Sequence, residues 1–330
     1  MDIVSAFRDK IKGRELMVVL PEGGDERIIQ VARRLMDEGL AVPVVLGKDE
    51  DIAVAIKKTG LELKGIETIN PKESPKLDTY TKRYIGGRDD ITEGIARRIV
   101  AKPLFFAGMM VACGDAHAVV GGVANATATV IQAGVLTIGL MEGIKTPSSY
   151  FLMIVPKFLG SQDRAFIYAD CAVNIDPSAE QLADIAIASA ASARRILGEV
   201  PRVAMLSFST RGSASSPSVD KVKKTIEIVR QRQPDLLIDG EFQADAAIVP
   251  KVAARKVKDG SSVAGNANVL IFPDLDAGNI AYKLTQYMAG AQAIGPFLQG
   301  FAKPITDLSR GASVDDIVST AVLTLAQLVE

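Results

Sequence analysis

The 330-residue sequence has a single histidine, His117, two cysteines, Cys113 and Cys171, and no tryptophan. A disulfide framework is therefore not expected, and a zinc site built from cysteine and histidine is nearly excluded. Chemistry that needs two histidines is excluded too, and no metal site is expected. The two cysteines are predicted to act as small apolar residues, and His117 to satisfy a structural hydrogen bond.

The sequence also lacks an excess of either charge, with 38 Lys and Arg against 39 Asp and Glu. This balance argues against nucleic-acid binding through an overall basic field, although it permits a local basic pocket for an anion. The N-terminal residues interleave charges without an apolar core, so no signal peptide is predicted. One uncharged stretch, residues 118–141, is long enough to span a bilayer. Its many glycine and threonine residues favour a buried strand, loop and helix instead, and we expect a cytoplasmic protein.

Short apolar runs alternate with helical patterns along the chain. Nearly continuous apolar character is typical of parallel strands buried on both faces, and predicts strands at residues 16–20, 41–46, 165–168, 203–208, 236–238 and 269–272. The predicted helices are residues 25–38, 178–197, 218–232 and 313–329, with Asp25 as the N-cap of the first and Gly39 as its stop. This alternation indicates an α/β fold with parallel sheets covered by helices. The length predicts about two domains, with a boundary near residues 145–147.

Common short motifs are absent, since the sequence has no GxxxxGK[ST], GxGxxG, HExxH or GxSxG. Ser309 and Arg310 instead precede Gly311 and the last predicted helix. There, backbone N–H groups, the helix dipole and a guanidinium can converge on an anion, although ordinary loop residues fit equally well. Ser313 and Asp316 have the spacing of a capping box, so from spacing alone a structural role for Asp316 is favoured.

Two further segments are candidates for ligand contact. Residues 120–132 carry small and hydroxyl side chains, which suit either the approach of a ligand to the backbone or close helix packing. Residues 208–218 include Arg211 and could hold an anion, but a solvated turn before a helix is the favoured interpretation.

Six blocks occur in order over essentially the whole chain: LPEGGDERI (20–28), ADCAVN (169–174), MLSFSTRGSA (205–214), PDLLIDGEFQADAA (234–247), NVLIFPDLDAGNIAYKL (268–284) and GPFLQGFAKPITDLSRG (295–311). Together they resemble the phosphate acetyltransferase, or phosphotransacetylase, family. The resemblance implies two α/β/α domains with mainly parallel sheets, like those of isocitrate and isopropylmalate dehydrogenases, an active cleft between them, and usually a homodimer. The last segment is expected to return to the first domain, giving domains 1–146 plus 296–330 and 147–295.

The implied reaction is the reversible conversion of acetyl-CoA and phosphate into CoA and acetyl phosphate, with CoA as a substrate and no other cofactor. The resemblance implies that Asp316 is the base for the CoA thiol, that Arg310 binds phosphate, and that Ser309 places the thiol or the transition state. A free carboxylate is a weak base toward a thiol, so the site has to bury the carboxylate or acidify the thiol through arginine charge.

Substrate contacts are also implied at other positions. Arg83 and Arg27 match arginines of the family's site, Gly311 belongs to its Ser-Arg-Gly motif, and Asn125, Thr127 and Gln132 lie in the segment after a predicted strand. Some positions depart from the family: Asn125 replaces a histidine, Thr129 an acid, Gln132 and Tyr287 arginines, and Ala312 a cysteine. A lost charge-assisted hydrogen bond costs about 1.5–3 kcal/mol. Three hypotheses therefore stay open: a phosphate acetyltransferase, a phosphate acyltransferase for another short acyl group, and a catalytically weak regulatory protein that binds CoA or phosphate.

Overall fold

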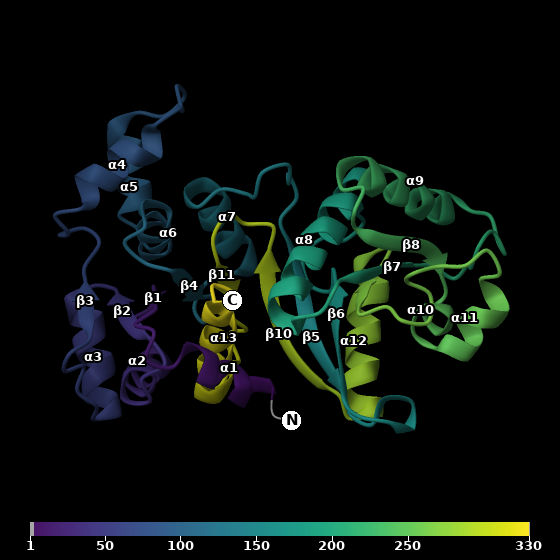
Figure 1. Cartoon of the computed structure of the whole chain (residues 1–330). Helices are drawn as coiled ribbons and strands as arrows, with labels where there is room; N and C mark the ends of the chain where they lie inside the picture. The colour runs from purple at the N-terminus through teal and green to yellow at the C-terminus, as the bar shows by residue number, and fades with distance from the viewer. Residues whose placement is uncertain (1–2, 330) are drawn as a thin grey trace. The chain divides into compact units, whose positions relative to one another are not determined.

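The computed structural model describes residues 3–329 and forms two compact units, whose elements are labelled in Figure 1. One unit comprises the chain up to Glu142 together with Phe301 and the residues after it, and the other comprises Gly143–Gly300. The expected boundaries, 146/147 and 295/296, lie a few residues from these positions. The second of them would cut strand β10 (Gln292–Gln299), whose pairing with β5 (Ser148–Val155) continues to Gln299.

The first unit is built on a five-stranded sheet with the order β11-β4-β1-β2-β3. Every neighbouring pair in it is parallel. The two strands that come first in the sequence confirm the strand predictions at residues 16–20 and 41–46. The strands are β1 (Met17–Leu20), β2 (Val42–Leu46), β3 (Glu67–Ile69), β4 (Ala118–Gly121) and β11 (Ile305–Asp307).

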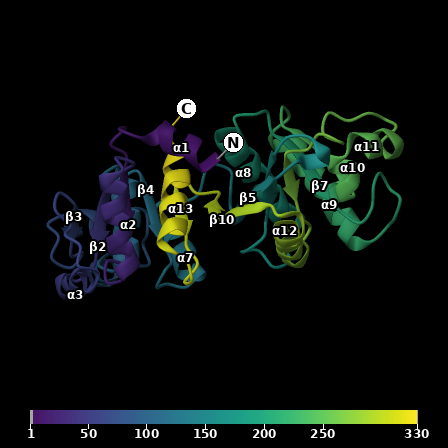
Figure 2. The ribbon, with the colours of Figure 1, turned by 90° about the horizontal axis from the view of Figure 1, so that it is seen from below.

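Helices cover this sheet in two groups. The C-terminal helix α13 packs on α1, α2, β4 and β11, whereas α6 and α7 pack on each other and also cover β4 and β11. Figure 2 shows α13, in yellow, near α2 and below α1, although these segments are far apart in sequence. The helices are α1 (Ile3–Ile11), α2 (Glu26–Asp37), α3 (Asp49–Thr59), α4 (Leu77–Ile85), α5 (Glu93–Val100), α6 (Pro103–Cys113), α7 (Thr127–Thr137) and α13 (Val314–Ala326).

Local sequence explains where the key helices begin. Asp25 is the N-cap of α2, as predicted, and its side chain accepts the Arg27 backbone N–H. Ser313 is the N-cap of α13. The uncharged residues 118–141 form β4, a loop and α7, which confirms the expectation of a strand, loop and helix. Within residues 3–329, no helix combines the length and the apolar character needed to cross a membrane.

The second unit contains a six-stranded sheet with the order β10-β5-β6-β9-β7-β8. Strands β6, β9, β7 and β8 are parallel, but β5 is antiparallel to both of its neighbours. The sequence predicted mainly parallel sheets, and residues 148–155 were not among its predicted strands; an apolar run reports burial and does not report direction. The remaining strands are β6 (Arg164–Ala169), β7 (Arg202–Leu206), β8 (Leu237–Phe242) and β9 (Val269–Ile271).

Helices also cover the second sheet. The helices α8 and α9 pack on each other; α8 covers the central strands, and α12 packs on β5, β6 and β10. A core of buried side chains that includes Phe151, Phe166 and Phe242 fills this unit. Its helices are α8 (Ala179–Leu197), α9 (Pro217–Arg232), α10 (Ala244–Ile248), α11 (Pro250–Lys256), α12 (Leu275–Ala289) and the single 3₁₀ turn η1 (Phe158–Gly160).

The rare sulfur and imidazole side chains differ in their surroundings. Cys171 is buried, as expected. Cys113 is exposed at the C-terminal end of α6, so the expectation of an apolar environment is wrong there: Met110 and Val111 of the same turn are buried, whereas Cys113 lies on the face of the helix that is open to solvent. His117 Nδ1 accepts the Met17 backbone N–H at 2.9 Å, which is the structural hydrogen bond that we predicted.

Candidate active site

Three loops of the first unit follow strands that are neighbours in its sheet. Because β1, β4 and β11 are parallel, their C-terminal ends lie at one edge of the sheet. After β1 the chain continues to β2 on one side, whereas β4 and β11 lie on the other side, so this edge is a topological switch point. Ligands of open α/β sheets bind at such a point. A pocket of about 270 Å³ lies on the β2 side of this point, lined by residues 21–25, by residues after β2 and β3, by Ala101 and Pro103, and by Ala124.

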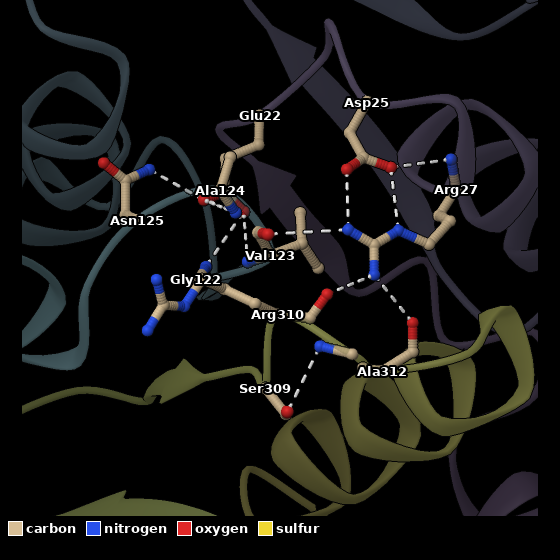
Figure 3. Close-up of polar contacts among 11 residues, drawn as sticks. Glu22, Asp25, Arg27, Gly122, Val123, Ala124, Asn125, Ser309, Arg310 and Ala312 are labelled. Atoms are coloured by element: carbon tan, nitrogen blue, oxygen red, sulfur yellow. Dashed lines mark hydrogen bonds and ion pairs between the residues drawn. The ribbon is translucent and has the colours of Figure 1, made fainter.

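Glu22 follows β1 and fixes the loop after β4. Its side chain is buried, and its carboxylate accepts the backbone N–H groups of Gly122, Val123 and Ala124, each at 2.9 Å. The side-chain Nδ2 of Asn125 donates a fourth hydrogen bond at 2.7 Å. Figure 3 shows these donors converging on the one carboxylate. Hydrogen bonds to a charged acceptor are the stronger class, so this loop is held in one conformation.

Arg27, in the first turn of α2, fixes the loop after β11. Its Nη1 donates to the backbone oxygens of Arg310 and Ala312 at 2.8 and 2.9 Å. Its Nε and Nη2 form a two-pronged pair with Asp25, and Nη2 also donates to Val123 O at 3.4 Å. The Arg27 hydrogen bond lowers the pKa of Asp25, and the same pair raises the pKa of Arg27. The guanidinium therefore ties three loops together (Figure 3).

Ser309, Arg310 and Gly311 form the exposed end of the loop that leads into α13. Ser309 Oγ accepts the Gly311 N–H at 3.2 Å. Within residues 3–329 the Arg310 guanidinium makes no hydrogen bond or ion pair, and in Figure 3 its side chain extends toward the segment that carries Gly122 and Asn125. An unpaired guanidinium at the start of a helix can bind a phosphate through charge and directed N–H groups.

Asp316 is exposed and closes the capping box of α13. Its Oδ2 accepts the Ser313 N–H at 2.9 Å and the Ser313 hydroxyl at 2.7 Å, while Ser313 Oγ accepts the Asp316 N–H. The structural role favoured by the spacing is therefore confirmed. Within residues 3–329, Asp316 Oδ1 makes no hydrogen bond, so one carboxylate oxygen stays available for a proton.

Asp307, the last residue of β11, lies buried beneath the candidate loops. Its Oδ2 accepts the Thr127 hydroxyl at 2.5 Å, which connects the first turn of α7 to β11. In the described part of the chain, Asp307 Oδ1 is buried without a hydrogen-bond partner. Burial raises the pKa of Asp307 to about 6, and the charge of Glu22 adds to the effect, whereas the Thr127 hydrogen bond opposes it. Asp307 therefore keeps its proton to a higher pH than an exposed aspartate does.

The structure does not bring every expected residue into this group of contacts. Arg83 is exposed on α4, and its charge lies near Cys113. Gln132 is exposed on α7, and no described contact joins it to the loops after β1 or β11. The loop at 208–218 is anchored to β8, because Arg211 pairs with Asp239 of that strand at 2.8 Å.

Sequence reasoning missed two carboxylates of the site, Glu22 and Asp307. Glu22, in LPEGG, follows the end of the buried strand β1 with one residue between, and Asp307, in TDLSRG, is the last residue of β11. A carboxylate at the C-terminal end of a parallel strand is a usable signal, because those ends meet at the ligand edge of the sheet. Their partners, 100 to 180 residues away in sequence, follow only from the fold.

Comparison with known proteins agrees with this architecture. The chain matches the phosphate acetyl/butaryl transferase family model over residues 2–325. It is 44% identical over 329 residues to the phosphate acetyltransferase of Thermoanaerobacterium thermosaccharolyticum, covering 99% of both chains. It is 42% identical to the phosphate acetyltransferase of Clostridium acetobutylicum, covering 99% of this chain and 98% of the relative. A crystal structure of a phosphotransacetylase from Streptococcus pyogenes matches with a TM-score of 0.90 and 41% identity, over 98% of this chain and 97% of that one. The chain therefore belongs to the phosphate acetyl/butaryl transferase family.

Proposed function

We propose that this protein is a phosphate acetyltransferase, which transfers an acetyl group between CoA and phosphate. The observation that carries the proposal is the loop with Ser309, Arg310 and Gly311, which leads into α13 and presents an unpaired guanidinium. The loop sits at the ligand edge of a parallel sheet in a chain of this family. Both substrates carry phosphate groups, which suit such a site.

The proposed reaction needs one proton acceptor and one anion-binding group. In the direction of acetyl-CoA formation, the CoA sulfur attacks the carbonyl carbon of acetyl phosphate, and the thiol proton passes to the carboxylate of Asp316. The bond between the carbonyl carbon and the phosphate oxygen then breaks, and phosphate leaves with the electron pair. Arg310 stabilises the charge on the departing phosphate, and Ser309 Oγ places the thiol or the transition state.

The exposure of Asp316 bears on how the thiol is activated. The Asp316 carboxylate is exposed to water, so the thiol has to be activated by a neighbouring charge. The guanidinium of Arg310 can lower the pKa of a thiol placed beside it. The free Oδ1 of Asp316 then accepts the proton while Oδ2 keeps its hydrogen bonds to Ser313. Most of the rate comes from holding the two substrates in position, because no covalent enzyme intermediate is involved.

Other residues are proposed to bind the substrates. Gly311 and Asn125 lie on the loops at the sheet edge and Thr127 begins α7, whose N-cap, Ala126, has no polar side chain to cap the first N–H groups of the helix. The Thr129 N–H already donates to Ala126 O at 2.8 Å, so the N–H groups of Thr127 and Ala128 are the ones that can donate to a substrate phosphate. The exposed Arg83 and Gln132 remain proposed contacts to CoA or acetyl phosphate.

A thioester-formation assay tests the function and the acyl group together. Purified protein is mixed with CoA and acetyl, propionyl or butyryl phosphate, and the absorbance of the new thioester is followed. We expect the highest kcat/KM with acetyl phosphate. A higher value with propionyl or butyryl phosphate would assign a different acyl preference. No turnover with any of the three acyl phosphates, together with CoA binding measured by calorimetry, would show that the protein binds CoA without catalysing acyl transfer.

We also propose that the protein is a homodimer, located in the cytoplasm. Helix α12 supports the dimer, because Ile280, Leu284 and Met288 repeat at four-residue intervals and are 57%, 51% and 81% exposed. Three large apolar side chains on one helix face are a feature of surfaces that bind another chain. A twofold contact would place this face against its own copy.

Light scattering after size exclusion tests the dimer. We expect Leu284→Lys with Met288→Lys to convert a dimer into a monomer, because two charges would have to be buried in an apolar contact. Val54→Lys is the control, since Val54 is equally exposed, at 54%, but lies on α3 of the other unit. A wild-type protein that elutes as a monomer, or a double variant that stays dimeric, contradicts this assignment of the α12 face.

A further inference from the structure

We propose that Glu22 and Arg27 are positioning residues of the acyl-transfer site, which act by fixing its two substrate-facing loops. The inference rests on the proposed function. Both residues come from the short segment after β1, yet each bonds to a loop far away in sequence, at residues 122–125 and 310–312. The two loops carry the residues proposed to contact substrate, so the segment after β1 sets their relative position.

The hydrogen bonds of Glu22 leave it no part in the chemistry itself. Its Oε2 accepts the N–H groups of Gly122 and Val123, and its Oε1 accepts Ala124 N–H and Asn125 Nδ2. The residue is 8% exposed, so substrate does not reach it. Three successive N–H groups form a cradle that would otherwise bind an external anion. Glu22 occupies that cradle, and the external phosphate is left to the adjacent N–H groups of α7 and to Arg310.

Arg27 is likewise fully engaged. A guanidinium has five N–H donors, and here the five hydrogen bonds of Arg27 end on the two oxygens of Asp25 and on the backbone oxygens of Val123, Arg310 and Ala312. Asp25 also neutralises its charge at 2.7 Å. Arg27 therefore has no N–H group left to bind a phosphate unless this network breaks. Its contribution to the site is geometric.

The two loops also contact each other, so a displacement of one loop also displaces the other. The Leu308 N–H donates to Gly121 O at 2.8 Å, and Gly122 lies against Asp307 and Leu308. Moving residues 122–125 therefore displaces Ser309 and Arg310. A displacement of about 1 Å at a reacting group can cost a hundredfold in rate. The hydrogen bonds of Glu22 and Arg27 therefore affect catalysis as well as stability.

The first test is Glu22→Gln in the full chain. Whichever carboxylate oxygen becomes an NH₂ group, two N–H donors of the loop lose their acceptor. We expect kcat/KM for acetyl-CoA formation to fall ten- to a hundredfold at a temperature well below the unfolding midpoint, mainly through kcat. Asp239→Asn is the matched control: Asp239 is 6% exposed and holds Arg211, Arg230 and the Gly240 N–H in the other unit. It should lower the unfolding midpoint and leave kcat/KM unchanged.

The second test is Arg27→Lys, which keeps the charge and removes the five directed hydrogen bonds. We expect a fall in kcat of tenfold or more, as for Glu22→Gln. A loss confined to the KM for acetyl phosphate would instead mean that Arg27 binds phosphate directly. If Glu22→Gln is folded and as active as the wild type, the inference is wrong. If Glu22→Gln does not fold, the kcat of Arg27→Lys tests the inference: a tenfold fall supports it, and an unchanged kcat contradicts it. An inactive wild type would overturn the proposed function itself, whereas an active wild type with fully active variants would overturn only the positioning role of Glu22 and Arg27.

Discussion

Replacing Gly122 by alanine perturbs the contact between the two substrate-facing loops directly. Gly122 has φ +116°, and an added Cβ would lie 2.3 Å from Asp307 Oδ1, 2.6 Å from Leu308 N and 2.8 Å from Leu308 O. Two of these atoms are backbone, so relief requires a loop to move by about 1 Å, since favourable contacts lie near 3.5 Å. Backbone strain of about 1–3 kcal/mol and overpacking of about 1–3 kcal/mol together lower the free energy of unfolding by about 2–6 kcal/mol.

The same displacement reaches Ser309 and Arg310, so we expect kcat of Gly122→Ala to fall about a hundredfold. Gly114→Ala is the control, because Gly114 also has a positive φ, +84°, but an added Cβ meets no atom within 4 Å. It should cost only about 1–2 kcal/mol and leave the rate unchanged. Urea unfolding and initial rates of thioester formation measure both quantities. Equal stabilities and equal rates for the two variants would refute the described packing of Gly122 against Leu308.

Three further changes test single groups of the site. Asp316→Asn should lower kcat about 10²- to 10⁴-fold, as expected for loss of a general base; full activity in an initial-rate assay would leave Asp316 with its capping role alone. Burial raises the pKa of Asp307 to about 6, so the folded protein binds this proton more tightly than the unfolded chain does, and wild-type stability should fall relative to Asp307→Asn as pH rises from about 4 to about 6. The expected change in the free energy of unfolding, measured with urea, is at most about 3 kcal/mol. A difference in this free energy between the wild type and Asp307→Asn that does not vary with pH would contradict a buried, protonated Asp307. Gln132→Arg should lower the KM for acetyl phosphate, and unchanged kinetics would show that another group already supplies that charge.

Local features of the site could be predicted from the sequence because their partners are neighbours in the chain. The N-cap at Asp25 and the box formed by Ser313 and Asp316 depend on spacings of two or three residues. The strands β1 and β2 follow from short apolar runs, and the loop before α13 follows from Ser309, Arg310 and Gly311. In each case the physical cause lies within a few residues.

The contacts that join the loops could not be predicted in this way. Arg27 was expected to contact substrate, and its role in joining the loops could not be predicted: two of its acceptors, the backbone oxygens of Arg310 and Ala312, lie 283 and 285 residues further on and are not marked by any sequence pattern. Glu22 accepts hydrogen bonds mainly from backbone N–H groups, which every residue except proline has. The strand β5 was not predicted, and its antiparallel direction does not follow from the sequence, because side-chain type records burial and not pairing.

The most direct test of the account is the rate of acetyl-CoA formation from CoA and acetyl phosphate by the wild type and by Arg310→Ala. Arg98→Ala serves as the control, since Arg98 lies on α5 and, among residues 3–329, its side chain bonds only to Gly94 O of the same helix. The account predicts an active wild type, an unchanged control, and a fall in kcat/KM of at least about a thousandfold for Arg310→Ala, as for loss of a group that binds the transferring phosphate. An Arg310→Ala enzyme that retains the wild-type rate would contradict the assignment of this loop as the acyl phosphate site.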